Sequence, residues 1–239
     1  SVNDSPAIQY TDFTSLTVDA LSGDDDIDVD VNTLAIGTFN VNGDLPTTSG
    51  GDLLSVSGTN ANFSPSAADA GSIVVDAQTI AIASTEQVFF DGETGNGTLT
   101  LTTPSAADSI ILLPGSTIDS GNLQAGSLLG LNFGNLGSAG SVSLDDASGT
   151  RFDSLTVAGT TGDDIWTLAA TDGVITLNNQ LTIATPGVAT VTLSDTDGND
   201  IFNVNATQPY TAITLSGGQG SDTALVSGTA SSDTIGVSL

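Results

Sequence analysis

The stretch Phe152-Asp153-Ser154-Leu155-Thr156-Val157, which leads into Gly162-Asp163-Asp164-Ile165-Trp166, decides the fold expected for this chain. Its first segment alternates polar and apolar residues and is rich in side chains that favour strands. Its second segment places glycine and aspartate before the next apolar residue, where a chain turns easily. Together the two segments predict a short strand, a tight corner and a second strand.

The same unit recurs along the chain. Phe13-Thr14-Ser15-Leu16-Thr17-Val18 also runs into a Gly-Asp-Asp corner, at Gly23-Asp24-Asp25. In a second correspondence, Leu16-Thr17-Val18 and its corner match Val191-Thr192-Leu193 and the corner at 198–200. The two correspondences use different registers, so the sequence does not fix one period. Strand-plus-corner units of roughly 20–25 residues are compatible with a stacked repeat.

We therefore predict an all-β fold, a parallel β-solenoid of the β-helix kind, with tandem β-sandwich domains as the alternative. Residues 1–150 are expected to form a first β-repeat unit, with a Gly/Leu-rich insert near 104–140. Residues 151–239 are expected to form a second unit with calcium-type turns. Residues 232–237 still alternate like a strand unit, which predicts a stack without a cap at that end.

The charge of the chain is strongly one-sided. Its 28 acidic residues face a single basic one, Arg151, for a net charge of −27. Such a charge repels nucleic acid and anionic membranes, and it opposes compaction unless cations lie close by. Carboxylates at sharp corners suit Ca²⁺, which prefers hard oxygen ligands. We therefore expect bound calcium, with general halophilic acidity as the alternative.

The residue types that are absent restrict the chemistry. The chain has no cysteine and no histidine, so thiolate and imidazole metal sites cannot form. Catalysis would fall to carboxylates and hydroxyls, and aromatic residues to line a sugar cleft are few. We therefore expect no enzyme. No apolar run is long enough to span a membrane. The start at Ser1 is interpreted as a processed product that is extracellular, either secreted or on the cell surface.

The candidate calcium ligands are the acidic and amide side chains of the corners. They are Asp24, Asp25, Asp26, Asp28, Asp163, Asp164, Asp195, Asp197, Asn199, Asp200 and Asp222. The alternatives are turns in which Asp and Asn cap their own backbone, and, around Asp24, a charged strand edge that blocks unwanted pairing. The spacing from Asp195 to Asn199 imitates an EF-hand, but Ala206 stands where the closing glutamate belongs, which excludes that loop.

Gly217-Gly218-Gln219-Gly220-Ser221-Asp222-Thr223-Ala224-Leu225 resembles the glycine-rich nonapeptide of RTX-type calcium-binding proteins. The stretches 198–202 and 162–166 resemble its second half, and Gly-Asp-Asp repeat regions of large bacterial surface adhesin or matrix proteins are similar overall. The resemblance implies calcium at glycine-rich corners. The chain departs from the pattern because Asp164, Asp200 and Asp222 are separated by 36 and 22 residues, which implies longer rungs.

The expected function is structural: a calcium-stabilised subunit of a filament, surface layer or matrix. An uncapped stack presents strand edges to a neighbour, so we expect head-to-tail self-association into a homopolymer. One alternative is a calcium-dependent adhesin module that binds cell-surface glycans or another surface. A polysaccharide hydrolase is the other alternative. No nucleic-acid partner is expected.

Overall fold

The computed structural model describes residues 12–31, 36–44 and 51–231. Residues 232–237, expected to form a strand unit, lie outside this part of the chain. The described residues contain no α-helix and form 21 strands. These are β1 (Ser15–Asp19), β2 (Asp26–Asp30), β3 (Thr38–Asn42), β4 (Leu53–Ser57), β5 (Ala61–Pro65), β6 (Gly71–Val75), β7 (Gln78–Ala83), β8 (Gln87–Asp91), β9 (Thr98–Thr103), β10 (Ser109–Pro114), β11 (Gly121–Ala125), β12 (Leu131–Gly134), β13 (Ser141–Asp146), β14 (Asp153–Ala158), β15 (Ile165–Leu168), β16 (Ile175–Leu177), β17 (Thr182–Ala184), β18 (Val188–Ser194), β19 (Ile201–Val204), β20 (Ala212–Ser216) and β21 (Thr223–Val226).

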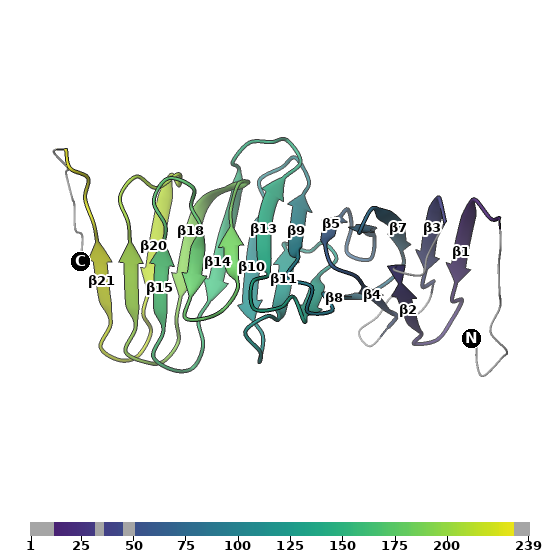
Figure 1. The fold of residues 1–239 in the computed structure, drawn as a ribbon, viewed down its shortest axis with the longest axis horizontal. Helices are drawn as coiled ribbons and strands as arrows, with labels where there is room; N and C mark the ends of the chain where they lie inside the picture. The colour runs from purple at the N-terminus through teal and green to yellow at the C-terminus, as the bar shows by residue number, and fades with distance from the viewer. Residues whose placement is uncertain (1–11, 32–35, 45–50, 232–239) are drawn as a thin grey trace.

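The strands build two open, mostly parallel sheets, which confirms the all-β prediction. The larger sheet has the order β1-β3-β7-β6-β5-β9-β13-β17-β16-β15-β19-β21, and the smaller has the order β2-β4-β8-β12-β11-β10-β14-β18-β20. Outside three antiparallel meanders, the chain crosses from one sheet to the other at every step between strands, and two crossings complete one rung, which adds a strand to each sheet. Figure 1 shows the rungs stacked along the long axis of the molecule, with β1 and β21 near opposite ends.

Three antiparallel meanders interrupt the alternation between sheets. They are β5-β6-β7 and β15-β16-β17 in the larger sheet and β10-β11-β12 in the smaller. In each, the first strand pairs with a later rung and the last strand pairs with an earlier one, as β5 does with β9 and β7 with β3. The two-residue connection Asp76-Ala77 between β6 and β7 has positive φ at both positions, as a tight hairpin requires.

The meanders explain why the sequence does not show one period. At the ends of the stack, Ser15 pairs with Thr38 and Ile201 with Thr223, within the expected range of rung lengths. In the middle, a rung that contains a meander is longer, so the residue that pairs with Thr98 on the next rung is as far along the chain as Ser141. The repeated Phe-x-Ser-Leu-Thr-Val segments also fall in different sheets, since one forms β1 and the other β14.

One hydrophobic core lies between the two sheets. Every second residue of most strands points inward, as in the pattern of buried and half-buried positions along β9. The largest fully buried side chains include Trp166, Phe63 and Phe90, and the Trp166 ring stacks on that of Phe202 with centroids 6.2 Å apart. The outward positions carry mainly Thr, Ser, Asn and Asp, which keeps the outer faces polar.

Hydrogen-bonded strand pairs cross the proposed boundary at residue 150. Strand β10 pairs with β14, and β13 pairs with β17, so both sheets continue through this point. The region 104–140 contains the meander β10-β11-β12, whose middle strand buries Leu123 and Ala125. The division into two units stays a prediction.

Candidate metal centre

Acidic side chains occupy the position directly before many strands, and there they connect neighbouring rungs. Asp164, Asp200 and Asp222 precede β15, β19 and β21. The backbone N–H of Asp164 donates to Oδ1 of Asp200 at 2.8 Å, and the N–H of Asp200 donates to Oδ1 of Asp222 at 3.0 Å. The separations of 36 and 22 residues seen in the sequence are therefore the offsets between stacked rungs.

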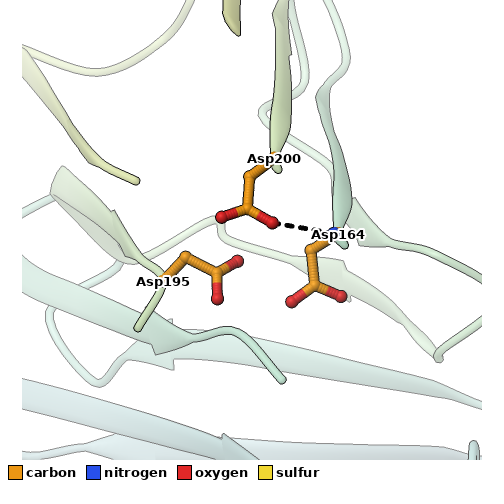
Figure 2. A group of neighbouring side chains, drawn as sticks. All are labelled: Asp164, Asp195 and Asp200. Atoms are coloured by element: carbon orange, nitrogen blue, oxygen red, sulfur yellow. Dashed lines mark hydrogen bonds between the residues drawn. The ribbon is translucent and has the colours of Figure 1, made fainter. Parts of the chain in front are cut away.

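A third buried carboxylate reaches this corner from the other sheet. Asp195 directly follows β18 of the smaller sheet, whereas Asp164 and Asp200 precede strands of the larger one. One carboxylate oxygen of each residue lies within 4.8 Å of the others, and all three side chains are buried. Figure 2 shows the three carboxylates turned toward a common space.

The hydrogen bonds of the cluster leave one oxygen without a partner. Asp195 accepts from Nε1 of Trp166 at 3.1 Å and from the backbone N–H of Thr196 at 2.9 Å. Asp164 accepts from the backbone N–H of Thr160 at 2.7 Å and from Nδ2 of Asn178. Oδ2 of Asp200 is buried and has no hydrogen-bond partner. An unsatisfied buried carboxylate oxygen is costly, so a cation or a proton bound to it would be favourable.

The same burial changes the acidity of the cluster. The pKa of Asp195 is raised to about 6, mainly by burial and further by the Asp164 carboxylate. Hydrogen bonds from Trp166 and Thr196 lower this pKa but do not offset the burial. Burial also raises the pKa of Asp200, to which the charges of Asp222 and Asp164 contribute. Three carboxylates in one dry corner cannot all ionise cheaply without a compensating positive charge.

The donor set fits a hard divalent cation. The three ligand groups are carboxylates, and oxygen is the ligand that Ca²⁺ and Mg²⁺ prefer. Gly159 makes room for them, because a Cβ atom there would collide with the carboxylate of Asp195. The cluster of Asp164, Asp195 and Asp200 can therefore hold a metal ion.

The structure places the remaining predicted residues of this region on the surface. There they form a second ladder, that is, a second series of side-chain bonds to the backbone of the next rung. Oδ1 of Asp163 accepts from the backbone N–H of Asn199 at 2.8 Å, and Oδ1 of Asn199 accepts from that of Ser221 at 3.1 Å. Asp197 is exposed, and its backbone forms an isolated bridge with Gln219. These side chains hold the backbone of adjacent corners together.

At the other end of the stack, the predicted residues separate. Asp24, Asp26 and Asp28 are exposed and belong to no converging group of three carboxylates in the described part of the chain. Asp25 is half-buried, and its backbone N–H donates to Oδ1 of the buried Asp52 at 2.8 Å. The N–H of Asp52 in turn donates to Oε2 of Glu86 at 2.9 Å.

Sequence reasoning missed several members of these ladders, namely Asp52, Glu86, Asp108 and Asp153. Each stands at or directly before the start of a strand, and none belongs to a Gly-Asp-Asp corner. A search for any acidic residue directly before an alternating run would have found them.

No protein-family model matches this chain, and no curated protein and no solved structure matches it. Its class therefore follows from the fold and the site: an all-β protein of two mostly parallel sheets with a buried three-carboxylate corner. None of the described residues belongs to a helix of the length and apolarity that crossing a bilayer requires.

Proposed function

We propose that this chain is a calcium-stabilised β-solenoid that serves as a structural subunit outside the cell. The observation that carries the proposal is the convergence of Asp164, Asp195 and Asp200 around the unpartnered oxygen of Asp200. Extracellular calcium modules work with dissociation constants of about 0.1–1 mM, which matches the calcium available outside cells. The proposed Ca²⁺ would take one or more oxygens from each aspartate and complete its shell with water.

Calcium at this corner would fasten parts of the fold that are distant in the sequence. Asp164 and Asp200 come from successive rungs of the larger sheet, and Asp195 comes from the smaller sheet. A shared ion would therefore connect two rungs and both sheets. It would also replace the mutual repulsion of the carboxylates by attraction. This role is structural, because the ion would be surrounded by groups that hold the backbone.

The solenoid assignment rests on the alternation between sheets and the stacking of rungs. Parallel registers such as β14 with β18 and β18 with β20 continue one rung after another. Stacked rungs make contact mainly with their neighbours, which is the defining property of a solenoid. The meanders are additions to individual rungs, and the parallel pairing resumes on both sides of each.

Head-to-tail assembly is the second part of the proposal. Within the described residues, β1 and β21 are the terminal strands of the larger sheet. The backbone N–H of Thr223 donates to the carbonyl oxygen of Asp200, and that of Ser227 donates to the carbonyl oxygen of Val204 in β19. Because successive N–H groups of a strand point to opposite sides, those of Ala224 and Val226 point to the open edge. Val226 is 54% exposed, and a second copy adding its β1 would cover it.

The adhesin alternative has less support. The outer face of β5, β9 and β13 carries a row of hydroxyl and amide groups suited to glycans. These groups bond one another, with Oγ1 of Thr102 donating to Oδ1 of Asn62 at 2.9 Å and Thr98 bonded to Ser141 at 2.9 Å. Groups that satisfy each other have less to offer a ligand, which favours the structural role.

Thermal unfolding with calcium and with a chelator, at fixed ionic strength, tests the calcium proposal. An ion at about 100 times its dissociation constant stabilises by about 2.7 kcal/mol, or about 5–10 °C in Tm for a chain of this size. Asp200→Asn keeps the oxygen that Asp164 N–H needs but removes the charge, and it should remove most of the shift in Tm. Asp197→Asn removes the same charge at an exposed residue, and this variant should retain the shift in Tm. An equal calcium response in both variants would refute the site.

Assembly is tested by sedimentation and negative-stain microscopy in calcium. Val226→Pro removes an N–H from the open edge without removing a bond to β19, so it should leave a folded monomer. Val226→Thr keeps that N–H and the β-branched shape, and it should still assemble. Monomers of the unmodified chain at high concentration in calcium would contradict the assembly proposal and leave the calcium proposal intact.

A further inference from the structure

We infer that the chain carries a second cation site, formed by Asp108, Asp146 and Asp153, on the same plan as the first but with the two sheets exchanged. The inference rests on the proposed function only for the identity of the ion, calcium. Its geometry is independent, because it shares no residue with the cluster of Asp164, Asp195 and Asp200.

The first element of the plan is a pair of acids at the starts of adjacent parallel strands. At the first site, Asp164 and Asp200 precede β15 and β19 of the larger sheet. At the second, Asp108 precedes β10 and Asp153 opens β14, which are paired in the smaller sheet. The backbone N–H of Asp108 donates to Oδ1 of Asp153 at 2.9 Å, as that of Asp164 does to Asp200.

The second element is an acid that arrives from the opposite sheet. Asp195 directly follows β18 of the smaller sheet, and Asp146 ends β13 of the larger. In both cases a short loop then connects this acid to the strand-start acid of the same rung, Asp200 or Asp153. At the first site the chain thus crosses from the smaller sheet to the larger, and at the second site it crosses from the larger to the smaller.

Unpartnered buried oxygens point to a ligand at the second site. Asp146 is only 2% exposed, and its Oδ2 is buried without a hydrogen-bond partner. Oδ2 of Asp108 is also buried and unpartnered. Asp153 is fully buried, and its Oδ2 accepts from Oγ1 of Thr103 at 2.6 Å. The second site therefore leaves two carboxylate oxygens unsatisfied, where the first leaves one.

The electrostatics of the second site match the geometry. Burial raises the pKa of Asp108 and of Asp153, and the nearby charge of Asp146 raises both further. The one basic side chain of the protein does not compensate them. Nη1 of Arg151 donates to the carbonyl oxygens of Thr185 at 2.7 Å and Val188 at 3.0 Å. The three carboxylates therefore keep a need for positive charge from outside the chain.

The second site is more open than the first. In the described part of the chain, only Asp164, Asp195 and Asp200 bring one oxygen each within 4.8 Å of one another. Calcium holds its ligands at about 2.3–2.6 Å and accepts water in place of protein oxygens. An ion among Asp108, Asp146 and Asp153 would therefore keep more water and bind more weakly. Two classes of site, one tight and one weak, are expected.

The sites can be distinguished because Trp166, the single tryptophan, lies at the first of them. Calorimetric titration of the full chain with Ca²⁺ counts both classes. Luminescence of Tb³⁺, excited through tryptophan, reports the first site only. Asp146→Asn should lose the weaker calorimetric class and keep the Tb³⁺ signal, and Asp195→Asn should do the reverse. Asp145→Asn, a change of equal charge on the neighbouring residue, should keep both.

The inference is overturned if Asp146→Asn binds calcium with the same number of sites as the unmodified chain, or if Asp145→Asn loses the same class. Asp108→Asn provides a second variant with the same expected loss, should Asp146→Asn fail to fold. Absence of the Tb³⁺ signal, together with a class that only Asp146→Asn removes, would refute calcium at the first cluster while supporting the second site.

Discussion

Replacing Asp195 by asparagine should change how stability depends on pH, and in a direction that differs from most surface aspartates. In calcium-free buffer with a chelator, burial raises the pKa of Asp195 from 3.8 to about 6 in the folded protein. A raised carboxyl pKa contributes stability that is fully present below pH 3.8 and is lost as the pH rises through about 6. The unmodified protein should therefore become less stable between these values, because Asp195 ionises freely in the unfolded chain but at a cost in its buried site, where Asp164 adds repulsion.

The size of the effect follows from the same numbers. Each pKa unit corresponds to about 1.4 kcal/mol, so the rise from 3.8 to about 6 amounts to at most about 3 kcal/mol. Asparagine does not ionise and escapes this loss. It has one acceptor oxygen, however, where Asp195 uses two oxygens for Trp166 and Thr196, and one lost hydrogen bond costs about 1 kcal/mol. The variant should be about 1 kcal/mol less stable well below pH 3.8 and about 2 kcal/mol more stable near pH 7.

Urea denaturation followed by Trp166 fluorescence at a series of pH values measures this difference. Comparing the variant with the unmodified protein cancels the titration of Asp200, Asp108 and Asp153, which both proteins share. The two stability curves should cross between pH 4 and about 6. Added calcium should stabilise the unmodified protein more than the variant near pH 7, because the variant keeps only the weaker site at Asp108, Asp146 and Asp153. A difference in unfolding free energy that stays constant with pH would refute the reasoning, because Asp195 would then not be held neutral by burial.

Two further predictions concern packing. Gly159→Ala places a methyl group against the carboxylate of Asp195, so it should cost about 1–3 kcal/mol and weaken the calcium response. Gly162→Ala, with no atom within 4 Å of its added Cβ, should stay within about 0.5 kcal/mol. Calcium-dependent melting curves of the pair decide this, and equal effects would contradict it. Phe63→Ala should cost about 3–5 kcal/mol because Phe63 is fully buried, and Phe152→Ala, at a side chain 54% exposed, should cost far less. Urea denaturation that gives similar losses for both would show that the core is misplaced.

The fold class was predictable because it depends on local patterns. Alternation in segments such as 98–102 and 174–177 sets which side chains point inward, and that rule holds in any sheet. The meanders were not predictable, since the sequence of β5 does not say that it pairs with β9 ahead of it and not with the preceding rung. Such pairings depend on contacts between residues far apart in the chain.

The candidate site was predictable in its members but not in its arrangement. Asp164, Asp195 and Asp200 were recognisable because they belong to Gly-Asp corners or an Asp-rich loop. Their convergence depends on which sheet each corner joins, and that depends on the long-range pairing of β15 with β19. Conversely, Asp24, Asp26 and Asp28 have the same local signature, but Asp24 is exposed ahead of β2 and alternation within β2 turns Asp26 and Asp28 to solvent.

The choice between aspartate and asparagine within the ladders supports a need for charge at the buried corners. Exposed corners make the same backbone bond with aspartate, as at Asp163, and also with asparagine: Oδ1 of Asn60 accepts from Thr98 N–H at 3.0 Å, and Oδ1 of Asn96 from that of Ala139 at 3.0 Å. An amide is therefore sufficient to join two rungs. At buried corners such as Asp52 and Asp200, where a charge costs more, the chain uses carboxylates, each with one unpartnered oxygen. If rung-to-rung bonding were their only role, amides would serve at the buried corners as well and would cost less to bury. A buried carboxylate in place of an adequate amide is what a cation bound between rungs requires.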